Sequence, residues 1–317
     1  MKNCRYYSLP LVLGATLLFA CEKYVDFNGK ELLPKMVISA IINAKSDTGT
    51  IKISESVFDY SSQKSVAVEN PEINLKINGE SCAQLWFDTL IGVHSYYKFI
   101  SHLKTGDRVE FSAHTSKHGT VKGYDIVPEI VAEIKNIEPL WFKRDGFGYL
   151  RLLVTVRDNP DEKNFYRIVV RTNAVLINPS IQEVDNRWDL KEVFVDDEIL
   201  FNTATEKNGE GKTPDYYRIF SDEMFQGKEY TLNIYIRNDN FTENVNFDYV
   251  RQSVKVEIHT LSEKLYQNLH SQELASGITG DVFSEPVKIY TNMQGGYGIL
   301  GIYNVAEKIK PVAEKGN

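Results

Sequence analysis

The sequence predicts an all-β protein: an N-terminal immunoglobulin-like β-sandwich followed by a larger β-sandwich domain that carries one helix. Three observations support this fold class. Short runs rich in Val, Ile, Tyr and Phe recur roughly every ten residues, as in known sandwiches. Apolar and polar residues alternate in many runs, and Gly, Asn, Asp or Pro separates one run from the next. One stretch alone has clear helical periodicity.

The first sandwich is expected at residues 35–127. Asn78-Gly79 predicts a tight hairpin turn between the strands at residues 73–77 and 84–87, because both residue types tolerate positive φ. Cys82, just beyond this turn, is interpreted as a small buried strand residue rather than a reactive thiol. The expected strands are residues 36–42, 50–54, 73–77, 84–87, 96–100 and 108–113.

The second domain is expected at residues 128–307. It follows a junction bracketed by Pro128 and Pro139, within which residues 130–134 are a further candidate strand. A polar, glycine-bearing loop is expected at residues 202–214. The expected strands are residues 149–156, 165–170, 229–236 and 254–258.

The single expected helix begins after Ser262, a good N-cap residue, and ends at Gly277. A lone helix in a β domain usually plugs one end of a sandwich or covers a sheet edge. Residues 308–317 are expected to form a flexible tail. The apolar residues near one face of the helix are Leu261, Leu265, Tyr266, Leu269 and Leu274.

Residues 1–20 have the features of a bacterial secretory signal, with a charged start and an apolar run too short to span a membrane. The segment ends in Leu18-Phe19-Ala20-Cys21, the pattern of a lipobox, in which Cys21 becomes the lipidated N-terminus. An ordinary secretory signal with an incidental cysteine is the alternative. With lipidation, residues 21–34 form a tether between the membrane and the first sandwich.

The chain of 317 residues has a formal net charge of −7. This acidic balance argues against a nucleic-acid partner, which would require a basic surface. Cys4 leaves with the signal and Cys21 takes the lipid, so Cys82 has no disulfide partner within the chain. The fold is therefore expected to rely on packing alone.

Several segments resemble, in order and spacing, those of the Bacteroidetes lipoprotein family catalogued as domain of unknown function 4249. The resemblance covers essentially the whole mature chain, and its most specific part is the glycine-rich stretch at residues 291–301. Leu300 is a minor departure, since the family often has an aromatic residue there. The matching segments are residues 21–23, 165–167, 195–201, 220–227, 261–266, 284–287 and 291–301.

The resemblance implies a lipid-anchored outer-membrane protein, with the outer surface favoured over the periplasmic face. Such proteins are commonly encoded beside TonB-dependent receptors, so a role as a receptor accessory in ligand capture or uptake is expected. The membrane, through the lipid on Cys21, and such a receptor are the expected partners. A structural or adhesive surface lipoprotein without a transport role is one alternative, and a hydrolase with an unrecognised site is another.

The glycines of Gly295-Gly296-Tyr297-Gly298 are interpreted as structural, allowing a bulge or the close passage of another backbone. A phosphate-binding loop would require a following helix and a basic residue. Here the chain continues as an apolar run typical of a strand.

No catalytic motif is recognised, so we expect no enzyme activity, no catalytic residues, no cofactor and no metal. Paired carboxylates that meet only in space remain an alternative. His114 and His118 would lie roughly 13 Å apart on a strand, too far for one zinc ion, although a hairpin turn could bring them together. The acidic run at 158–162 is interpreted as a hairpin turn.

Ligand-binding candidates are aromatic and acidic residues that interrupt the strand pattern. Surface Trp and Tyr side chains stack on flat ligands and anchor interfaces, and a cleft between domains is a common ligand site. Asp196-Asp197 is the best candidate among the acidic clusters for ion or ligand binding. The candidates are Trp141, Phe142, Trp188, Asp196, Asp197, Tyr216 and Tyr217.

Overall fold

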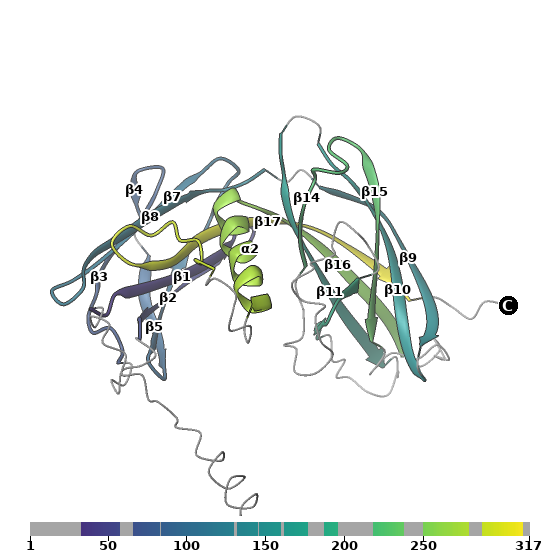
Figure 1. The fold of residues 1–317 in the computed structure, drawn as a ribbon, viewed down its shortest axis with the longest axis horizontal. Coiled ribbons are helices and arrows are strands. Elements are labelled where there is room, and N and C mark those ends of the chain that lie inside the picture. Colours follow the sequence, from purple (N-terminus) through teal and green to yellow (C-terminus); the bar gives the residue numbers. More distant parts are fainter. Residues whose placement is uncertain are drawn as a thin grey trace, which may run out of the picture. The chain divides into compact units, whose positions relative to one another are not determined.

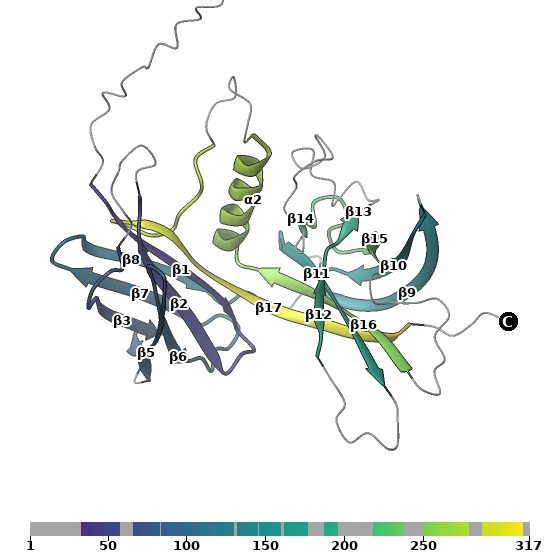
Figure 2. The same cartoon turned by 90° about the horizontal axis from the view of Figure 1, so that it is seen from below.

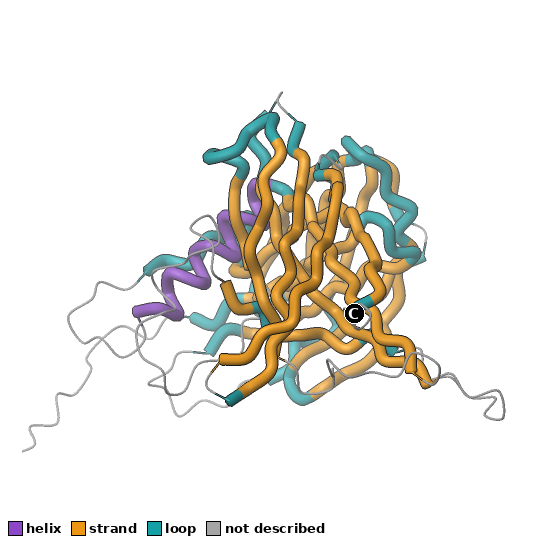
Figure 3. Tube along the Cα trace, turned by 90° about the vertical axis from the view of Figure 1, so that its right-hand side faces the viewer, coloured by secondary structure: helices purple, strands orange, loops and turns teal. Residues whose placement is uncertain are grey.

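The computed structural model describes residues 33–57, 66–82, 84–129, 132–144, 146–159, 162–176, 187–195, 218–237, 250–278 and 287–312. Strands predominate among these residues, which confirms the predicted all-β class (Figure 3). Within the described ranges there is one helix, α2 (Glu263–Ile278).

The largest sheet has nine strands, in the order β12-β11-β16-β17-β1-β2-β6-β5, with β14 also paired to β11 (Figure 1). We call it the large sheet. Its strands are β1 (Met36–Asn43), β2 (Thr48–Glu55), β5 (Leu85–Ile91), β6 (His94–Ile100), β11 (Phe165–Leu176), β12 (Asp189–Lys191), β14 (Arg218–Ser221), β16 (Val250–Leu261) and β17 (Tyr297–Pro311).

Two four-stranded sheets complete the fold. The N-terminal small sheet has the order β4-β3-β7-β8, with β3 (Glu72–Ile77), β4 (Glu80–Ser81), β7 (Arg108–Thr115) and β8 (Gly119–Ile126). The C-terminal small sheet has the order β13-β15-β10-β9, with β9 (Glu133–Arg144), β10 (Phe147–Arg157), β13 (Phe194–Val195) and β15 (Glu229–Arg237).

Strand β17 joins the early and late parts of the large sheet (Figure 2). Its first part runs parallel to β1, ending where Tyr303 pairs with Asn43. Its second part runs antiparallel to β16, from the pair of Leu261 with Tyr303 to the pair of Ser253 with Pro311. The domain boundary expected between residues 127 and 128 stays a prediction. The pairing shows that the large sheet contains strands from both sides of this boundary.

The first hydrophobic core lies between the N-terminal small sheet and strands β17, β1, β2 and β6 of the large sheet. On β1, every second side chain is buried, which is the period of a strand with one face in a core. Each fully buried large aliphatic residue contributes about 2 kcal/mol to this core. Its largest fully buried members are Met36, Ile38, Ile42, Ile51, Ile53, Leu75, Phe99 and Phe111.

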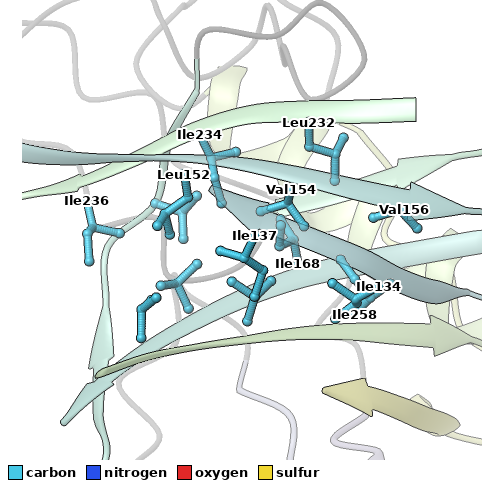
Figure 4. Packing of buried hydrophobic residues seen from close by; sticks show 14 of the residues in the cluster. Ile134, Ile137, Leu152, Val154, Val156, Ile168, Leu232, Ile234, Ile236 and Ile258 are labelled. Carbon is cyan, nitrogen blue, oxygen red and sulfur yellow. The ribbon is translucent and has the colours of Figure 1, made fainter. Parts of the chain in front are cut away.

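The second core lies between the C-terminal small sheet and strands β11 and β16 of the large sheet (Figure 4). Ile168 and Ile258 come from the large sheet, and Leu152, Val154 and Ile234 face them from the small sheet. Two sheets whose inner side chains interdigitate in this way form a β-sandwich.

Helix α2 begins as the sequence predicts. Ser262 Oγ accepts a hydrogen bond from the Leu265 backbone N–H (3.2 Å), which is N-cap geometry. Leu265 is fully buried against Leu261 and Ile299. The helix continues through Gly277 to Ile278, one residue beyond its expected end.

The glycine-rich stretch is structural, as expected. Gly298 has φ +102°, and a Cβ atom there would lie 1.8 Å from the Ile38 carbonyl oxygen on β1. A Cβ on Gly296 would meet the Met36 carbonyl oxygen at 2.4 Å, and one on Gly301 would meet the Leu265 side chain at 2.7 Å. These residues lack side chains because β17 passes close to β1 and α2.

The structure corrects one expected hairpin. Asn78 and Gly79 have positive φ and form the turn, but β4 is only two residues long. Beyond Cys82 the chain enters β5, which belongs to the large sheet. Residues 84–87 are therefore not the second strand of this hairpin, because alternation identifies a strand but not the sheet that it joins. Cys82 lies outside both strands and is half-buried against the first core.

The structure also differs in part from the expected tail and the expected junction. Residues 308–311 belong to β17, where Lys308 Nζ donates hydrogen bonds to the Ile134 and Lys135 carbonyls (3.2 and 2.6 Å). Sequence analysis did not predict this part of the strand, because its alternating lysines resemble a solvated tail. Strand β9 runs through Pro139, which its position at the sheet edge tolerates.

Candidate functional site

A cavity of about 430 Å³ lies on the outer face of the N-terminal small sheet, away from the first core. We call it the polar pocket. Its floor follows the sheet register, with one cross-strand row formed by Asn74, Ser112 and Lys122. The complete lining is Asn74, Lys76, Arg108, Glu110, Phe111, Ser112, Lys122, Gly123, Tyr124, Asn292 and Gln294.

One wall of the polar pocket comes from the segment just before β17. Lys122 and Gln294 exchange two backbone hydrogen bonds, of 3.0 and 2.7 Å, which place Gln294 beside β8. The Asn292 side chain is held by the Leu300 backbone, accepting from its N–H (3.0 Å) and donating to its carbonyl (2.8 Å). A Cβ on Gly123 would lie 2.9 Å from the Asn292 carbonyl oxygen, so the close contact requires glycine.

Another wall is the ring of Tyr124, which lies between two cations. The Arg108 guanidinium carbon is 3.6 Å from the ring centre, and Lys264 Nζ from α2 is 3.1 Å from it. Groups so close to one centre must lie on opposite faces, because on the same face they would overlap. The hydrogen bond with Arg108 and the charge of Lys264 lower the pKa of Tyr124.

Asp125, which follows Tyr124 on β8, is buried and connects β8 to α2 and β17. Its Oδ2 accepts hydrogen bonds from Ser262 Oγ (2.5 Å) and from the Ile302 backbone N–H (2.9 Å). Burial raises the pKa of Asp125 to about 6, although these hydrogen bonds oppose the rise. One carboxyl group therefore holds β8, α2 and β17 together.

A second polar cluster lies on the face of the large sheet opposite the second core. His259 Nδ1 accepts from the Arg167 guanidinium (2.9 Å), and its Nε2 donates to Glu257 (3.0 Å). Burial lowers the pKa of His259, so the ring is neutral at pH 7. Burial opposes ionisation of Glu257, but His259 and Arg171 outweigh it and lower its pKa to about 2.

Two of the aromatic candidates lie on the C-terminal small sheet. Trp141 packs against the second core and is a structural residue. Phe142 belongs to an outer aromatic cluster, stacked on Tyr149 (5.3 Å between ring centres) and edge-on to Tyr235 (5.6 Å). Phe194 stacks on the same Tyr235 (5.3 Å).

The remaining candidates are separated from these or lie outside the described residues. Trp188 is beside the second polar cluster, with Lys255 Nζ 5.0 Å from the centre of one of its rings. Trp188 directly precedes β12 of the large sheet, whereas Phe142 lies on β9 of the C-terminal small sheet. The candidates outside the described part of the chain are Asp196, Asp197, Tyr216, Tyr217 and the lipidation residue Cys21.

The two neighbouring histidines have separate partners. His118 Nε2 lies 2.7 Å from Glu55, and its Nδ1 lies 2.9 Å from Thr115 Oγ1. His114 Nδ1 lies 3.0 Å from Thr120 Oγ1. Among the described residues, no group of three or more His, Cys, Asp or Glu side chains is arranged to hold a metal ion.

Two carboxyl groups meet near the turn between β10 and β11. Asp158 accepts hydrogen bonds from the Tyr166 hydroxyl and from the Gly227 backbone N–H. Asp222 accepts from the Asn164 backbone N–H (2.7 Å), and burial raises its pKa. Both carboxyl groups are buried at this connection. The hairpin expected at residues 158–162 is wrong, because β10 belongs to the C-terminal small sheet and β11 to the large sheet, so the chain crosses between sheets here.

Sequence reasoning missed the polar pocket because its residues follow no motif. Lys76, Arg108, Lys122 and Tyr124 occupy the outward positions of alternating strands, where charged residues are usually only solvated. The one available signal was Gly123 inside a strand, which marks the close approach of another backbone.

The fold and the pocket define an all-β protein of packed sheets that has a polar cavity on one of them. The family model described as Domain of unknown function (DUF4249) matches residues 22–309, and the chain belongs to this family. No curated protein sequence matches the chain. No helix in the described part of the chain is long and apolar enough to cross a membrane.

Two solved structures show weak similarity. The Yersinia pseudotuberculosis adhesin InvE is 12% identical, with a TM-score of 0.19, and the match covers 72% of this chain and 55% of the adhesin chain. A structure described as manganese lipoxygenase of Gaeumannomyces graminis with partial zonadhesin of Komagataella pastoris is 11% identical. Its TM-score is 0.16, and the match covers 71% and 88% of the two chains. Scores this low carry no argument about fold or function.

Proposed function

We propose that this protein is a lipid-anchored binding protein of the bacterial outer membrane that acts as an accessory of a TonB-dependent receptor in ligand capture or uptake. The proposal places the chain on the outer surface, attached through a lipid on Cys21. The Leu18-Phe19-Ala20-Cys21 sequence and the resemblance to Bacteroidetes lipoproteins support this location.

The polar pocket is the observation that carries the binding role. Lys76, Lys122 and Ser112 present donor groups into a cavity of about 430 Å³, a size typical of small-molecule sites. Backbone hydrogen bonds between Lys122 and Gln294 fix the position of its wall. A pre-formed polar cavity on a rigid sheet favours recognition of a small molecule.

The charged groups of the second polar cluster are engaged with one another. Glu257 accepts hydrogen bonds from His259 and Arg171, so its carboxylate stabilises contacts within the large sheet. Likewise, Asp158 and Asp222 are buried in turn contacts and do not line the polar pocket. The hydrolase alternative would require two carboxyl groups that face a substrate across a cavity. Glu55, Glu69 and Glu72 line a separate cavity where this alternative can be tested.

Purification of the tagged protein from detergent-solubilised native membranes tests the accessory role. We expect a TonB-dependent receptor to co-purify and to be identified by mass spectrometry. The Cys21→Ser protein, which lacks the anchor, should recover much less of it. Recovery of the lipidated protein alone, under conditions that keep the barrel soluble, would contradict the accessory role.

One observation favours the second candidate, a structural or adhesive surface lipoprotein. Edge strand β5 exposes four large apolar side chains, and exposed apolar edges are common interaction surfaces. A deletion strain separates the candidates: the adhesive role predicts altered surface attachment with normal nutrient growth. The exposed side chains are Trp86, Phe87, Leu90 and Ile91.

A further inference from the structure

We infer that the polar pocket binds a small molecule that carries an anionic group, such as a carboxylate or phosphate, on a hydroxyl-bearing body. This inference deepens the proposed binding function and names the chemistry of its ligand. It concerns a property of the described residues alone, so binding can be measured whether or not a receptor partner exists.

The charge of the pocket lining supports an anionic ligand. Lys76, Arg108 and Lys122 face a single carboxylate, Glu110, in a chain whose formal net charge is −7. Glu110 is already engaged by Arg108, with 2.9 Å between Nε and Oε1. Two ammonium groups therefore remain in excess, and a cationic ligand would be repelled.

The two lysines lie on opposite sides of the pocket floor. Lys76 is on β3 and Lys122 is on β8, with β7 between them. Neighbouring strands lie about 4.8 Å apart, so the two backbones are separated by roughly 10 Å. Both side chains are long enough to reach an anionic group placed over β7. Lysine commonly binds phosphate and carboxylate groups as a point charge.

The uncharged groups of the lining favour hydroxyls on the rest of the ligand. Ser112 lies on β7 at the centre of the floor, between Asn74 and Lys122 in the same row. Gln294 adds a second amide from the wall. Hydroxyl and amide side chains both donate and accept hydrogen bonds, as a ligand hydroxyl does.

The Tyr124 ring does not offer a stacking face to the ligand. Arg108 covers one face at 3.6 Å and Lys264 covers the other at 3.1 Å. Flat apolar ligands, which bind through ring stacking, are therefore disfavoured. The lowered pKa of Tyr124 is consistent with the cationic surroundings that an anion would meet.

Isothermal titration of the detergent-solubilised, full mature protein at low salt tests the inference. The probes are glucuronate, glucose 6-phosphate, inorganic phosphate and glucose. We expect saturable binding of at least one anionic sugar, at least ten-fold tighter than binding of glucose or inorganic phosphate. Raising the salt concentration should weaken it, since the lysines are solvent-accessible. The comparison of glucuronate with glucose 6-phosphate decides between a carboxylate and a phosphate ligand.

Variants of the two lysines assign the site. The double substitution Lys76→Ala and Lys122→Ala should weaken the anionic sugar at least ten-fold, and Lys122→Arg should retain most of the affinity. Lys310→Ala, an exposed lysine on β17 outside the pocket, is the matched control and should change nothing. Circular dichroism checks that each variant is folded.

The inference is overturned if neither anionic sugar binds, if the double variant binds as well as the parent, or if glucose or inorganic phosphate binds equally well. These results are independent of the receptor experiment. Anion binding without receptor recovery would contradict the accessory role only, and receptor recovery without anion binding would contradict the ligand class only.

Discussion

The Ser262 hydroxyl donates a hydrogen bond of 2.5 Å to the carboxyl group of Asp125, which precedes it by 137 residues. The same hydroxyl caps α2 through the Leu265 backbone N–H. Asp125 also accepts from the Ile302 backbone N–H on β17. One carboxyl group therefore connects β8, which lines the polar pocket, with α2 and with β17, the strand shared by both parts of the large sheet.

Asp125 should make stability depend on pH. Its pKa is about 6 in the folded protein, against an ordinary value of 3.8, so the folded state binds the proton more tightly. The stabilising contribution is full below about pH 3.8 and is lost as the pH rises through about 6. The difference between the two pKa values is equivalent to about 3 kcal/mol.

Asp125→Asn keeps the acceptor oxygen and removes the charge, so the pH-dependent difference between variant and parent should follow that titration. We expect Asp125→Asn to be at least as stable as the parent at pH 8 and Asp125→Ala to be less stable, by about 2 kcal/mol for the unpaired donors. Urea unfolding between pH 4 and pH 8 measures this. Parallel pH profiles for Asp125→Asn and the parent would contradict the buried titration.

The buried cluster around His259 predicts a large effect of Glu257→Gln. The substitution removes the anion that faces Arg171 and His259, and we expect the free energy of unfolding to fall by roughly 3 kcal/mol at pH 7. Glu307→Gln is the matched control on the neighbouring strand. Glu307 is half-exposed and contacts Lys255 at 3.6 Å, so its loss should be below about 1 kcal/mol.

The same cluster predicts an acid-sensitive contribution. The pKa of Glu257 is lowered from 4.5 to about 2, so its stabilisation is present above pH 4.5 and is lost as the pH falls towards 2. The stability difference between the parent and Glu257→Gln should shrink over this range in acid denaturation. A difference that stays constant down to pH 2 would contradict the assigned contacts.

Gly298→Ala tests the close passage of β17 along β1. The new Cβ would lie 1.8 Å from the Ile38 carbonyl oxygen, so we expect a loss above about 4 kcal/mol or failure to fold. Gly106→Ala is the matched control, because Gly106 also has positive φ but no atom within 4 Å of a Cβ. It should cost about 1 kcal/mol, from backbone strain alone. Equal losses in urea unfolding would contradict the steric explanation.

Tyr124 should titrate below its ordinary pKa of 10, because Arg108 and Lys264 stabilise the phenolate. Lys264→Met removes one of the two cations and should raise the pKa of Tyr124 towards 10. NMR of the tyrosine ring carbons, with Tyr124→Phe for assignment, measures this. An unchanged titration in Lys264→Met would show that the ring does not sense α2.

Local patterns predicted much of the fold. Apolar runs with strand-forming residues identified β1, β2, β10 and β15, the Asn78-Gly79 turn has positive φ at both residues, and Ser262 caps the helix. Alternation does not say which strands become neighbours. The parallel pairing of β1 with β17 therefore appeared only in the structure, as did the transfer of β5 to the large sheet.

The candidate site was predicted less well, since sequence reasoning gave most weight to aromatic residues. Trp141 proved to belong to the second core and Phe142 to an outer cluster. The polar pocket is built from residues of β3, β7 and β8 that share one face only after the strands pair. Lys122 meets Gln294 across 172 residues of sequence, a contact that no spacing rule indicates.

The central claim, a binding protein held at the membrane by a lipid on Cys21, is tested most directly by intact-mass measurement of the protein from native membranes. We predict a mature chain that begins at Cys21 and carries the added mass of the lipid. Cys21→Ser should lack that mass and leave the membrane fraction while remaining folded. A Cys21→Ser protein that stays in the membrane fraction, together with a parent of unmodified mass, would contradict the claim.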